Sequence, residues 1–390
     1  MPTRIGILRE SAPGEARVAL MPSIVPKYLK LGVELVMERG AGRRAFRLDE
    51  DYAACGVTLM DTPAEVLAST EVLIKVQPPN LDEIAQLKPG TVVLGYMNPH
   101  RHPEYALAMR DSDITSFAVE LLPRITRAQA MDVLTSQAAA AGYKAVLIGA
   151  NLLGGFLPML TNPTGTIRPA KVLVLGAGVA GLQAIATAKR LGAIVEAYDV
   201  RRATAEQVQS LGAKFIALEL NAEAEGGYAR QLSDEEKVKE RELLAEHVAT
   251  ADIVVTTAAI PGRDAPKLVF ADMVARMKQG SVIVDLAAAT GGNCELTRPG
   301  EDYVTENAVT ISGPLNVPAL MPTDASEMYA RNLLNFLTPQ IKEGVLTLDW
   351  EDQIIKESVL THHGTLHYEL SIPADYEAAL KKTLDQGGVK

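Results

Sequence analysis

The feature that most constrains this chain is a glycine-rich run, Lys171-Val-Leu-Val-Leu-Gly-Ala-Gly-Val-Ala-Gly181. Its apolar residues, Val172–Leu175, predict a buried parallel strand, and its three glycines have the spacing of a turn that opens a helix. A second predicted strand, Ile194–Tyr198, is followed directly by Asp199. This order predicts a Rossmann-type unit that binds a dinucleotide: a strand, a glycine turn, a helix, a second strand and an acidic residue.

Each position of this fingerprint has a physical reason. Gly176 permits the tight turn, Gly178 lets the backbone approach a pyrophosphate, and Gly181 lets the helix pack closely on the strand. The N–H groups that begin the helix offer partial positive charge to that pyrophosphate. Asp199 would accept hydrogen bonds from the adenosine ribose diol and repel a 2′-phosphate, which favours NAD over NADP. Two alternatives stay open: a structural turn without ligand, or a 2′-phosphate site at Arg201-Arg202 if Asp199 points away.

The composition excludes several classes of function. The net charge of −10 argues against a nucleic-acid-binding protein, because binding of the phosphates requires clustered lysine and arginine side chains. The two cysteines, Cys55 and Cys294, lie far apart without metal-ligand spacing, so we expect no metal site and a reducing, cytosolic environment. The longest apolar stretch, Ala145–Leu160, is broken by polar residues, glycine and proline and falls short of the about 20 residues of a membrane span. We therefore expect neither direct membrane insertion nor a secretory signal.

Two strand-and-helix rhythms predict two doubly wound α/β domains, each with helices on both faces of a parallel sheet. The tail is expected to return to the first domain, which then comprises residues 1–135 plus 325–390, while residues 136–324 form the nucleotide-binding domain. Long helices over Arg127–Ile148 and Ser326–Phe336 are expected to link the two, and Val345–Tyr368 is expected to form short strands. Ligands of open α/β sheets bind at the carboxyl ends of the strands, so a cleft there is the expected site.

A polar interval, Leu220–Arg241, interrupts the second rhythm and contains Gly226-Gly227-Tyr228. Two glycines beside an amphipathic aromatic residue are typical of a mobile lid tip, and equally of an ordinary surface turn. The charged run Asp234–Glu242 predicts a solvated helix face.

Four longer motifs resemble a known family: Glu10–Ala19, Pro123–Gln137, Gly291–Glu295 and Arg331–Pro339. With the fingerprint they span nearly the whole chain, and they are similar to the NAD(H)-binding subunit of the proton-translocating nicotinamide nucleotide transhydrogenases. The resemblance implies two Rossmann-like domains around a cleft, usually in a homodimer. It also implies that NAD(H) binds here, that NADP(H) binds on a partner subunit, and that a membrane-spanning subunit couples hydride transfer to proton passage. We therefore expect a cytoplasmic subunit, peripheral on the cytoplasmic face of the inner membrane.

The resemblance also implies roles for individual residues. Arg124, Asp132 and Thr135 fall where the family holds the nicotinamide end of NAD(H), and Gln129 falls where it faces incoming NADP(H). Tyr228 matches the tyrosine that closes over bound nucleotide, which favours the lid. The remaining implied cofactor contacts are Gly176, Gly178, Val179, Gly181, Asp199, Val200, Arg201, Gly227 and Ala259.

The residue types of the Arg124–Thr135 segment agree with this role. A nicotinamide carboxamide has one acceptor oxygen and two N–H donors, so it needs at least one donor and one acceptor. The guanidinium of Arg124 and the carboxylate of Asp132 supply both. The alternative is a plain helix entry, in which Thr126 caps the helix and Asp132 pairs with a base on its surface.

Alanine dehydrogenases share this architecture and are the main rival interpretation. Arg17 and Lys75 match their substrate-binding arginine and lysine, but Asn98 stands at their histidine position and Ala289 at their aspartate position. Asn98 cannot exchange a proton with a substrate, whereas hydride transfer between two nicotinamides needs only proximity and alignment. The retained Arg17 and Lys75 are alternatively structural ion pairs. A third interpretation is a regulatory NAD-binding module without turnover of its own.

Overall fold

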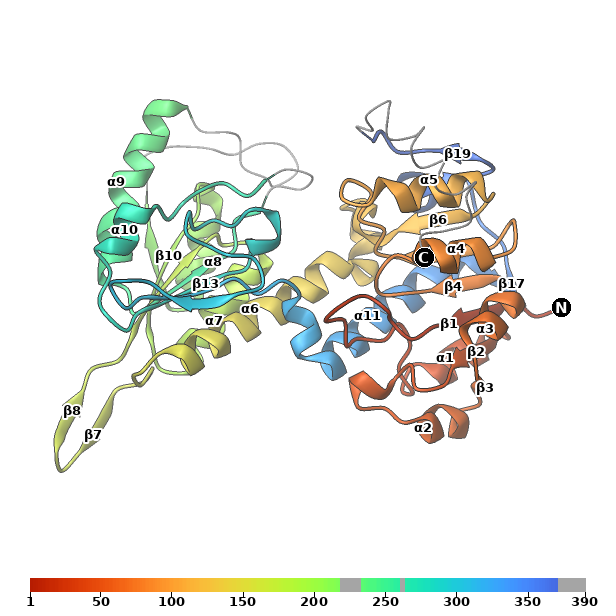
Figure 1. Ribbon diagram of the computed structural model, residues 1–390, viewed down its shortest axis with the longest axis horizontal. Coiled ribbons are helices and arrows are strands. Elements are labelled where there is room, and N and C mark those ends of the chain that lie inside the picture. Colours follow the sequence, from red (N-terminus) through yellow and green to blue (C-terminus); the bar gives the residue numbers. More distant parts are fainter. Residues whose placement is uncertain (218–232, 260–263, 371–390) are drawn as a thin grey trace. The chain divides into compact units, whose positions relative to one another are not determined.

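The chain divides into two compact units, and the computed structural model describes residues 1–217, 233–259 and 264–370. Unit 1 comprises Met1–Gln137 and Met321–Lys390, and unit 2 comprises Ala138–Leu320. Helix α6 (Val133–Leu152) begins in unit 1 and continues into unit 2. Figure 1 follows the chain through both units by colour.

Unit 1 is built on a sheet with the strand order β19-β18-β6-β5-β4-β1-β2-β3. Strands β1 to β6 are parallel and β18 and β19 are antiparallel, so the parallel part has the order 3-2-1-4-5-6 of a doubly wound fold. Its strands are β1 (Arg4–Ile7), β2 (Glu34–Glu38), β3 (Thr58–Met60), β4 (Val72–Ile74), β5 (Val92–Gly95), β6 (Thr115–Ala118), β18 (Val359–His362) and β19 (Thr365–Leu366), with a separate hairpin of β16 (Ile341–Lys342) and β17 (Val345–Leu346). Its helices are α1 (Val25–Lys30), α2 (Asp49–Ala54), α3 (Pro63–Ser69), α4 (Leu81–Gln86), α5 (Pro103–Asp111), α11 (Pro322–Leu337) and α12 (Gln353–Ser358).

Unit 2 repeats this plan, with the strand order β11-β10-β9-β12-β13-β15-β14. All neighbours are parallel except β14 and β15, and the parallel strands again have the order 3-2-1-4-5-6. Its strands are β9 (Lys171–Leu175), β10 (Ile194–Tyr198), β11 (Lys214–Ile216), β12 (Ile253–Thr256), β13 (Val282–Asp285), β14 (Asp302–Val304) and β15 (Thr310–Ser312). Its helices are α7 (Val179–Arg190), α8 (Ala205–Ser210), α9 (Asp234–Thr250) and α10 (Ala271–Ala275).

Both sheets are buried on two faces. Successive strand residues point to opposite sides of a sheet, and on each side they pack against helices. In unit 1, Ile74 lies in an apolar cluster with α1 and α11, whereas its neighbour Leu73 lies in a cluster with α3, α4 and α5. In unit 2, Val174 packs with α6, α7 and α8, whereas Leu175 packs with α9 and α10. Burial on both faces explains the continuous apolar runs of these strands. The predicted fold class, two Rossmann-like doubly wound α/β domains, is confirmed.

A β-hairpin stands apart from the two sheets. Within the described ranges its strands, β7 (Leu160–Asn162) and β8 (Gly165–Ile167), pair only with each other, and Figure 1 shows the hairpin extending away from the sheet of unit 2. Its base is fixed by the N–H of Ala170, which donates to the carbonyl of Leu157 at 3.0 Å.

Two regions differ from the sequence prediction. The expected helix Arg127–Ile148 is a 3₁₀ helix, η3 (Thr126–Met131), followed by α6, because Asp132 between them is extended (φ −71°, ψ 96°). The expected strands of Val345–Tyr368 are interrupted by α12, because the side chain of Asp352 caps it by accepting from the N–H of Ile354 at 2.8 Å. In the described parts of the chain, none of the helices is both long and apolar enough to span a bilayer.

Candidate functional site

The glycine turn of unit 2 connects β9 to α7 with a geometry that requires glycine. Gly176 has φ 99°, in the left-handed region that side chains disfavour. A Cβ atom on Gly181 would lie 1.8 Å from the carbonyl oxygen of Gly176, so the helix packs against the turn at a distance that only glycine allows. Gly178 is the N-cap residue of α7, and among the described residues a Cβ atom there would meet only the Arg201 guanidinium, at 4.0 Å. Val179 begins the helix and is exposed.

Asp199 follows β10 and points toward this turn. Its Oδ2 accepts the backbone N–H of Ala177 at 2.8 Å, so the acid and the turn are joined directly. Arg201 supplies three further donors: its backbone N–H at 2.8 Å and Nε at 2.9 Å reach Oδ1, and Nη2 reaches Oδ2 at 2.8 Å. The Asp199 side chain is buried (6% exposed), whereas the Arg201 side chain is 24% exposed. Asp199 therefore does not point away, and Arg201 is held by it.

The loop after β12 forms the adjacent part of the carboxyl edge. Thr257 donates from Oγ1 to the carbonyl of Gly176 at 3.0 Å, which ties the loop to the glycine turn. Asn293, fully buried, accepts the N–H of Ala258 at 3.0 Å and donates to the carbonyl of Ala258 at 2.8 Å. Ala259 follows and is exposed. Asn293 has no role predicted from the sequence, although it lies in the motif Gly291–Glu295 that carries the resemblance.

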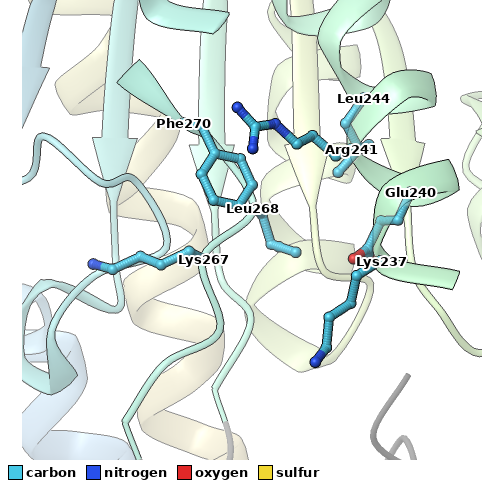
Figure 2. Close-up of a pocket in the computed structure, with 7 residues that line it drawn as sticks. All are labelled: Lys237, Glu240, Arg241, Leu244, Lys267, Leu268 and Phe270. Carbon is cyan, nitrogen blue, oxygen red and sulfur yellow. The ribbon is translucent and has the colours of Figure 1, made fainter. Parts of the chain in front are cut away.

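A pocket lies between α9 and the segment before α10 (Figure 2). Glu240 of α9 accepts the hydroxyl of Tyr198 at 2.7 Å, and burial raises the pKa of both groups. Arg241 contacts the ring of Phe270 and pairs with Asp272, with Nη2 and Oδ1 2.9 Å apart. The residues lining the pocket are Lys237, Glu240, Arg241, Leu244, Lys267, Leu268 and Phe270. Glu240 thus connects this pocket to Tyr198, the residue that directly precedes Asp199.

The Arg124–Thr135 segment lies in unit 1. Arg124 and Gln129 are exposed, on either side of the first turn of η3. Asp132 and Thr135 are brought together: Asp132 Oδ1 accepts the Thr135 N–H at 2.9 Å, and the Thr135 hydroxyl donates to Oδ2 at 2.6 Å. Asp132 therefore caps α6, which is the helix-entry role, although with Thr135 rather than a base as its partner.

Two residues of the rival dehydrogenase interpretation are buried in ion pairs of unit 1. Arg17 donates from Nε and Nη2 to the two carboxylate oxygens of Glu15, at 2.9 and 2.7 Å, and from Nη1 to Gln137 Oε1 at 2.8 Å. Burial alone would raise the pKa of Glu15, but the hydrogen bonds and charge of Arg17 lower it to about 2. Lys75 Nζ lies 2.9 Å from Glu83 Oε2 and 3.8 Å from Glu10 Oε2.

Asn98 occupies a tight turn after β5, with φ 45°. Its N–H and that of Met97 donate to Glu120 Oε1, at 2.6 and 2.9 Å. Glu120 Oε2 is buried and has no hydrogen-bond partner among the described residues. Burial raises the pKa of this carboxyl, and backbone hydrogen bonds oppose the shift.

The predicted site residues thus form two groups. Arg124, Gln129, Asp132 and Thr135 lie in unit 1, whereas the glycine turn, Val179, Asp199, Val200, Arg201 and Ala259 lie in unit 2. Val200 is half-buried against the α9 side of the sheet. Gly227 and Tyr228 lie outside the described residues, and Ala289 is exposed in a 3₁₀ turn after β13.

Comparison with known proteins extends over nearly all of the chain. The N-terminal domain of the family described as alanine dehydrogenase/PNT matches residues 6–141, and its C-terminal domain matches residues 145–369. The chain is 45% identical over 374 residues to the first part of NAD(P) transhydrogenase subunit alpha of Rhodospirillum rubrum, which covers 93% of this chain and 97% of that protein. It is 28% identical over 374 residues to alanine dehydrogenase of Methanococcus maripaludis, which covers 94% of both.

Comparison with solved structures gives the same two kinds of relative. The crystal structure of transhydrogenase from Sinorhizobium meliloti superimposes with a TM-score of 0.86 at 45% identity, over 93% of this chain and 99% of that one. An L-alanine dehydrogenase superimposes with a TM-score of 0.75 at 24% identity, over 98% of this chain and 99% of that one, which indicates a shared fold. As the resemblance predicted, the chain belongs to the alanine dehydrogenase/PNT family.

Proposed function

We propose that this chain is the NAD(H)-binding subunit of a proton-translocating transhydrogenase and passes hydride directly between NADH and NADP⁺ held on a partner subunit. One observation carries the proposal: Asp199 is fixed by the backbone N–H of Ala177 within the glycine turn. A carboxylate at that place suits the ribose diol of NAD and repels the 2′-phosphate of NADP. The 45% identity to a transhydrogenase subunit of Rhodospirillum rubrum supports this reaction.

The adenosine half of NADH binds at unit 2. The N–H groups at the start of α7 receive the pyrophosphate, and Gly178 leaves room for it. A carboxylate has about four acceptor positions. Ala177 and Arg201 already donate four hydrogen bonds to Asp199. The diol therefore binds by displacing part of the Arg201 guanidinium, which then remains beside the nucleotide.

The nicotinamide end is held by unit 1. The guanidinium of Arg124 donates to the carboxamide oxygen, while Asp132 and Thr135, already hydrogen-bonded to each other, accept its N–H groups. Gln129 is exposed on the same turn and faces the NADP(H) of the partner. NADH supplies the hydride, and these residues align it without a general acid or base. Tyr228 closes over the nucleotide in this proposal.

Two protein contacts complete the proposal. A homodimer is supported by the β7–β8 hairpin, since an isolated hairpin is marginally stable in water. Phe156 (53% exposed), Met159 (64%) and Ile167 (45%) present apolar surface on the hairpin and the segment leading into it. The chain also docks on the NADP(H)-binding and membrane-spanning subunits at the cytoplasmic face of the inner membrane, through protein contacts.

Reconstitution tests the reaction. The purified chain is mixed with NADH and NADP⁺, with and without the partner subunits of a related transhydrogenase, and separately with NADH, pyruvate and ammonium. We expect nucleotide-to-nucleotide transfer only with the partners. Turnover with pyruvate and ammonium would support the alanine dehydrogenase reading instead, and binding without any turnover would support a regulatory module.

The role of Gln129 gives a finer test. Gln129→Asn shortens an exposed side chain by one methylene group, so we expect slower hydride transfer with the NADH dissociation constant unchanged within about twofold. Stopped-flow transfer rates and fluorescence titration measure the two quantities. Loss of NADH binding would contradict the assignment of Gln129 to the partner-facing side.

A further inference from the structure

The carbonyl oxygen of Ala130 accepts two side-chain hydrogen bonds from one face of α11. Asn332 Nδ2 donates to it at 2.9 Å and Asn335 Nδ2 at 2.8 Å. Asn332 and Asn335 are three residues apart, so they lie on the same side of the helix. Ala130 stands between Gln129 and Asp132, which the proposed function places against the two nucleotides.

The hydrogen bonds continue from Asn332 into the start of α6. Asn332 Oδ1 accepts the hydroxyl of Ser136 at 2.8 Å. Gln137 Nε2 donates to Ser136 Oγ at 3.2 Å, and Gln137 Oε1 accepts from Arg17 at 2.8 Å. The network thus runs from the buried Arg17–Glu15 pair to the backbone of η3, entirely within unit 1.

Apolar packing against α11 also holds the η3 turn in place. Ala128 and Met131, 2% and 7% exposed, lie in the apolar cluster that includes Leu333 and Leu334 of α11. A 3₁₀ helix has poorer hydrogen-bond geometry than an α-helix and depends on such outside contacts. Two amide donors occupy both lone pairs of the Ala130 carbonyl, which resists rotation of this peptide unit.

We propose that Asn332 and Asn335 are positioning residues, which fix the η3 turn so that Gln129 and Asp132 hold one orientation relative to each other. The inference rests on the proposed function for its catalytic consequence, but the clamp itself is a property of unit 1. Asn332 and Asn335 act through the Ala130 peptide and touch neither nucleotide.

The test replaces Asn335, whose side chain is half-buried. Asn335→Asp keeps the shape, removes the donor and sets a carboxylate oxygen against the Ala130 carbonyl; Asn335→Ala only removes the donor. Arg331→Ala is the matched control, because Arg331 lies on the exposed side of α11 and pairs with Glu327. With partner subunits and saturating nucleotides, we expect transfer to fall about threefold to tenfold in Asn335→Asp and less in Asn335→Ala, as one lost hydrogen bond predicts. The NADH dissociation constant and thermal midpoint should change little.

Hydrogen exchange supplies a readout independent of turnover. Peptides spanning residues 125–135 should exchange faster in Asn335→Asp than in the wild type and in Arg331→Ala. Unchanged exchange, or an equal effect of Arg331→Ala, would overturn the clamp. A wild-type chain that gives no transfer with its partners would overturn the proposed function, while the exchange result would still decide the clamp.

Discussion

Asp199→Asn is the substitution that tests the nucleotide site most directly. Asparagine keeps the size of the side chain but replaces one carboxylate oxygen by an amide donor. In the protein, Oδ2 accepts from Ala177 N and Arg201 Nη2, and Oδ1 accepts from Arg201 N and Nε. Whichever way the amide turns, its N–H groups face two donors, and either the glycine turn or Arg201 loses its acceptor.

The expected magnitude follows from these contacts. Ala177 is 2% exposed, and a buried donor without a partner costs about 1–3 kcal/mol, so the free energy of unfolding should fall by about 2 kcal/mol. The ribose diol loses a charge-assisted acceptor as well, which weakens NADH binding by about tenfold to a hundredfold. Arg201, released from its ion pair, becomes available to a 2′-phosphate. NADPH binding should therefore strengthen while NADH binding weakens. The ratio of NADH affinity to NADPH affinity should fall by a larger factor than the NADH affinity itself.

Fluorescence titration with NADH and NADPH, together with urea denaturation, measures all three quantities. Asp272→Asn is the matched control, since Asp272 also pairs with an arginine, Arg241, but is 64% exposed at its side chain. The control should leave both affinities unchanged. Wild-type NADH affinity in Asp199→Asn, or an unaltered ratio of NADH to NADPH affinity, would refute the reasoning that Asp199 reads the ribose.

Three further predictions concern the fold, the buried acid and the assembly. Gly181→Ala forces a Cβ atom against the Gly176 carbonyl and should destabilise the chain by at least about 1–3 kcal/mol in urea denaturation; an unchanged midpoint would contradict the close packing. Burial raises the folded-state pKa of Glu120, so its stabilising contribution is present at low pH and is lost as the pH rises through that pKa. The difference in thermal midpoint between Glu120→Gln and the wild type should therefore shift in favour of the variant from pH 5 to pH 8. A shift in the opposite direction would exclude a raised pKa. Replacing Phe156 and Met159 together by aspartate should convert a dimer to monomers in sedimentation velocity, and a dimer that persists would place the interface elsewhere.

The polar anchors of the candidate site were the hardest features to predict from sequence. Asn293 holds the loop after β12 through Ala258, but the sequence marks it only as one residue of the motif Gly291–Glu295. Asn332 contacts Ala130 across 202 positions of the chain. No local periodicity encodes such pairs, because their partners are backbone groups of distant loops. The helix expected from Arg127 is present only from Val133 onward, because Asp132 is extended and Thr126–Met131 form a 3₁₀ turn in contact with α11.

The sequence by itself determined the doubly wound fold and the place of the glycine turn. Both depend on local physics: buried parallel strands need continuous apolar runs, and the left-handed φ of Gly176 excludes a side chain. The tertiary structure alone decided where the charges go. It turned Asp199 toward the glycine turn and joined it to Arg201, and it closed Arg17 into a buried pair with Glu15 that reaches Gln137, 120 residues away. Burial sets the strength of these pairs, and each pair is buried only once the unit that carries it has folded.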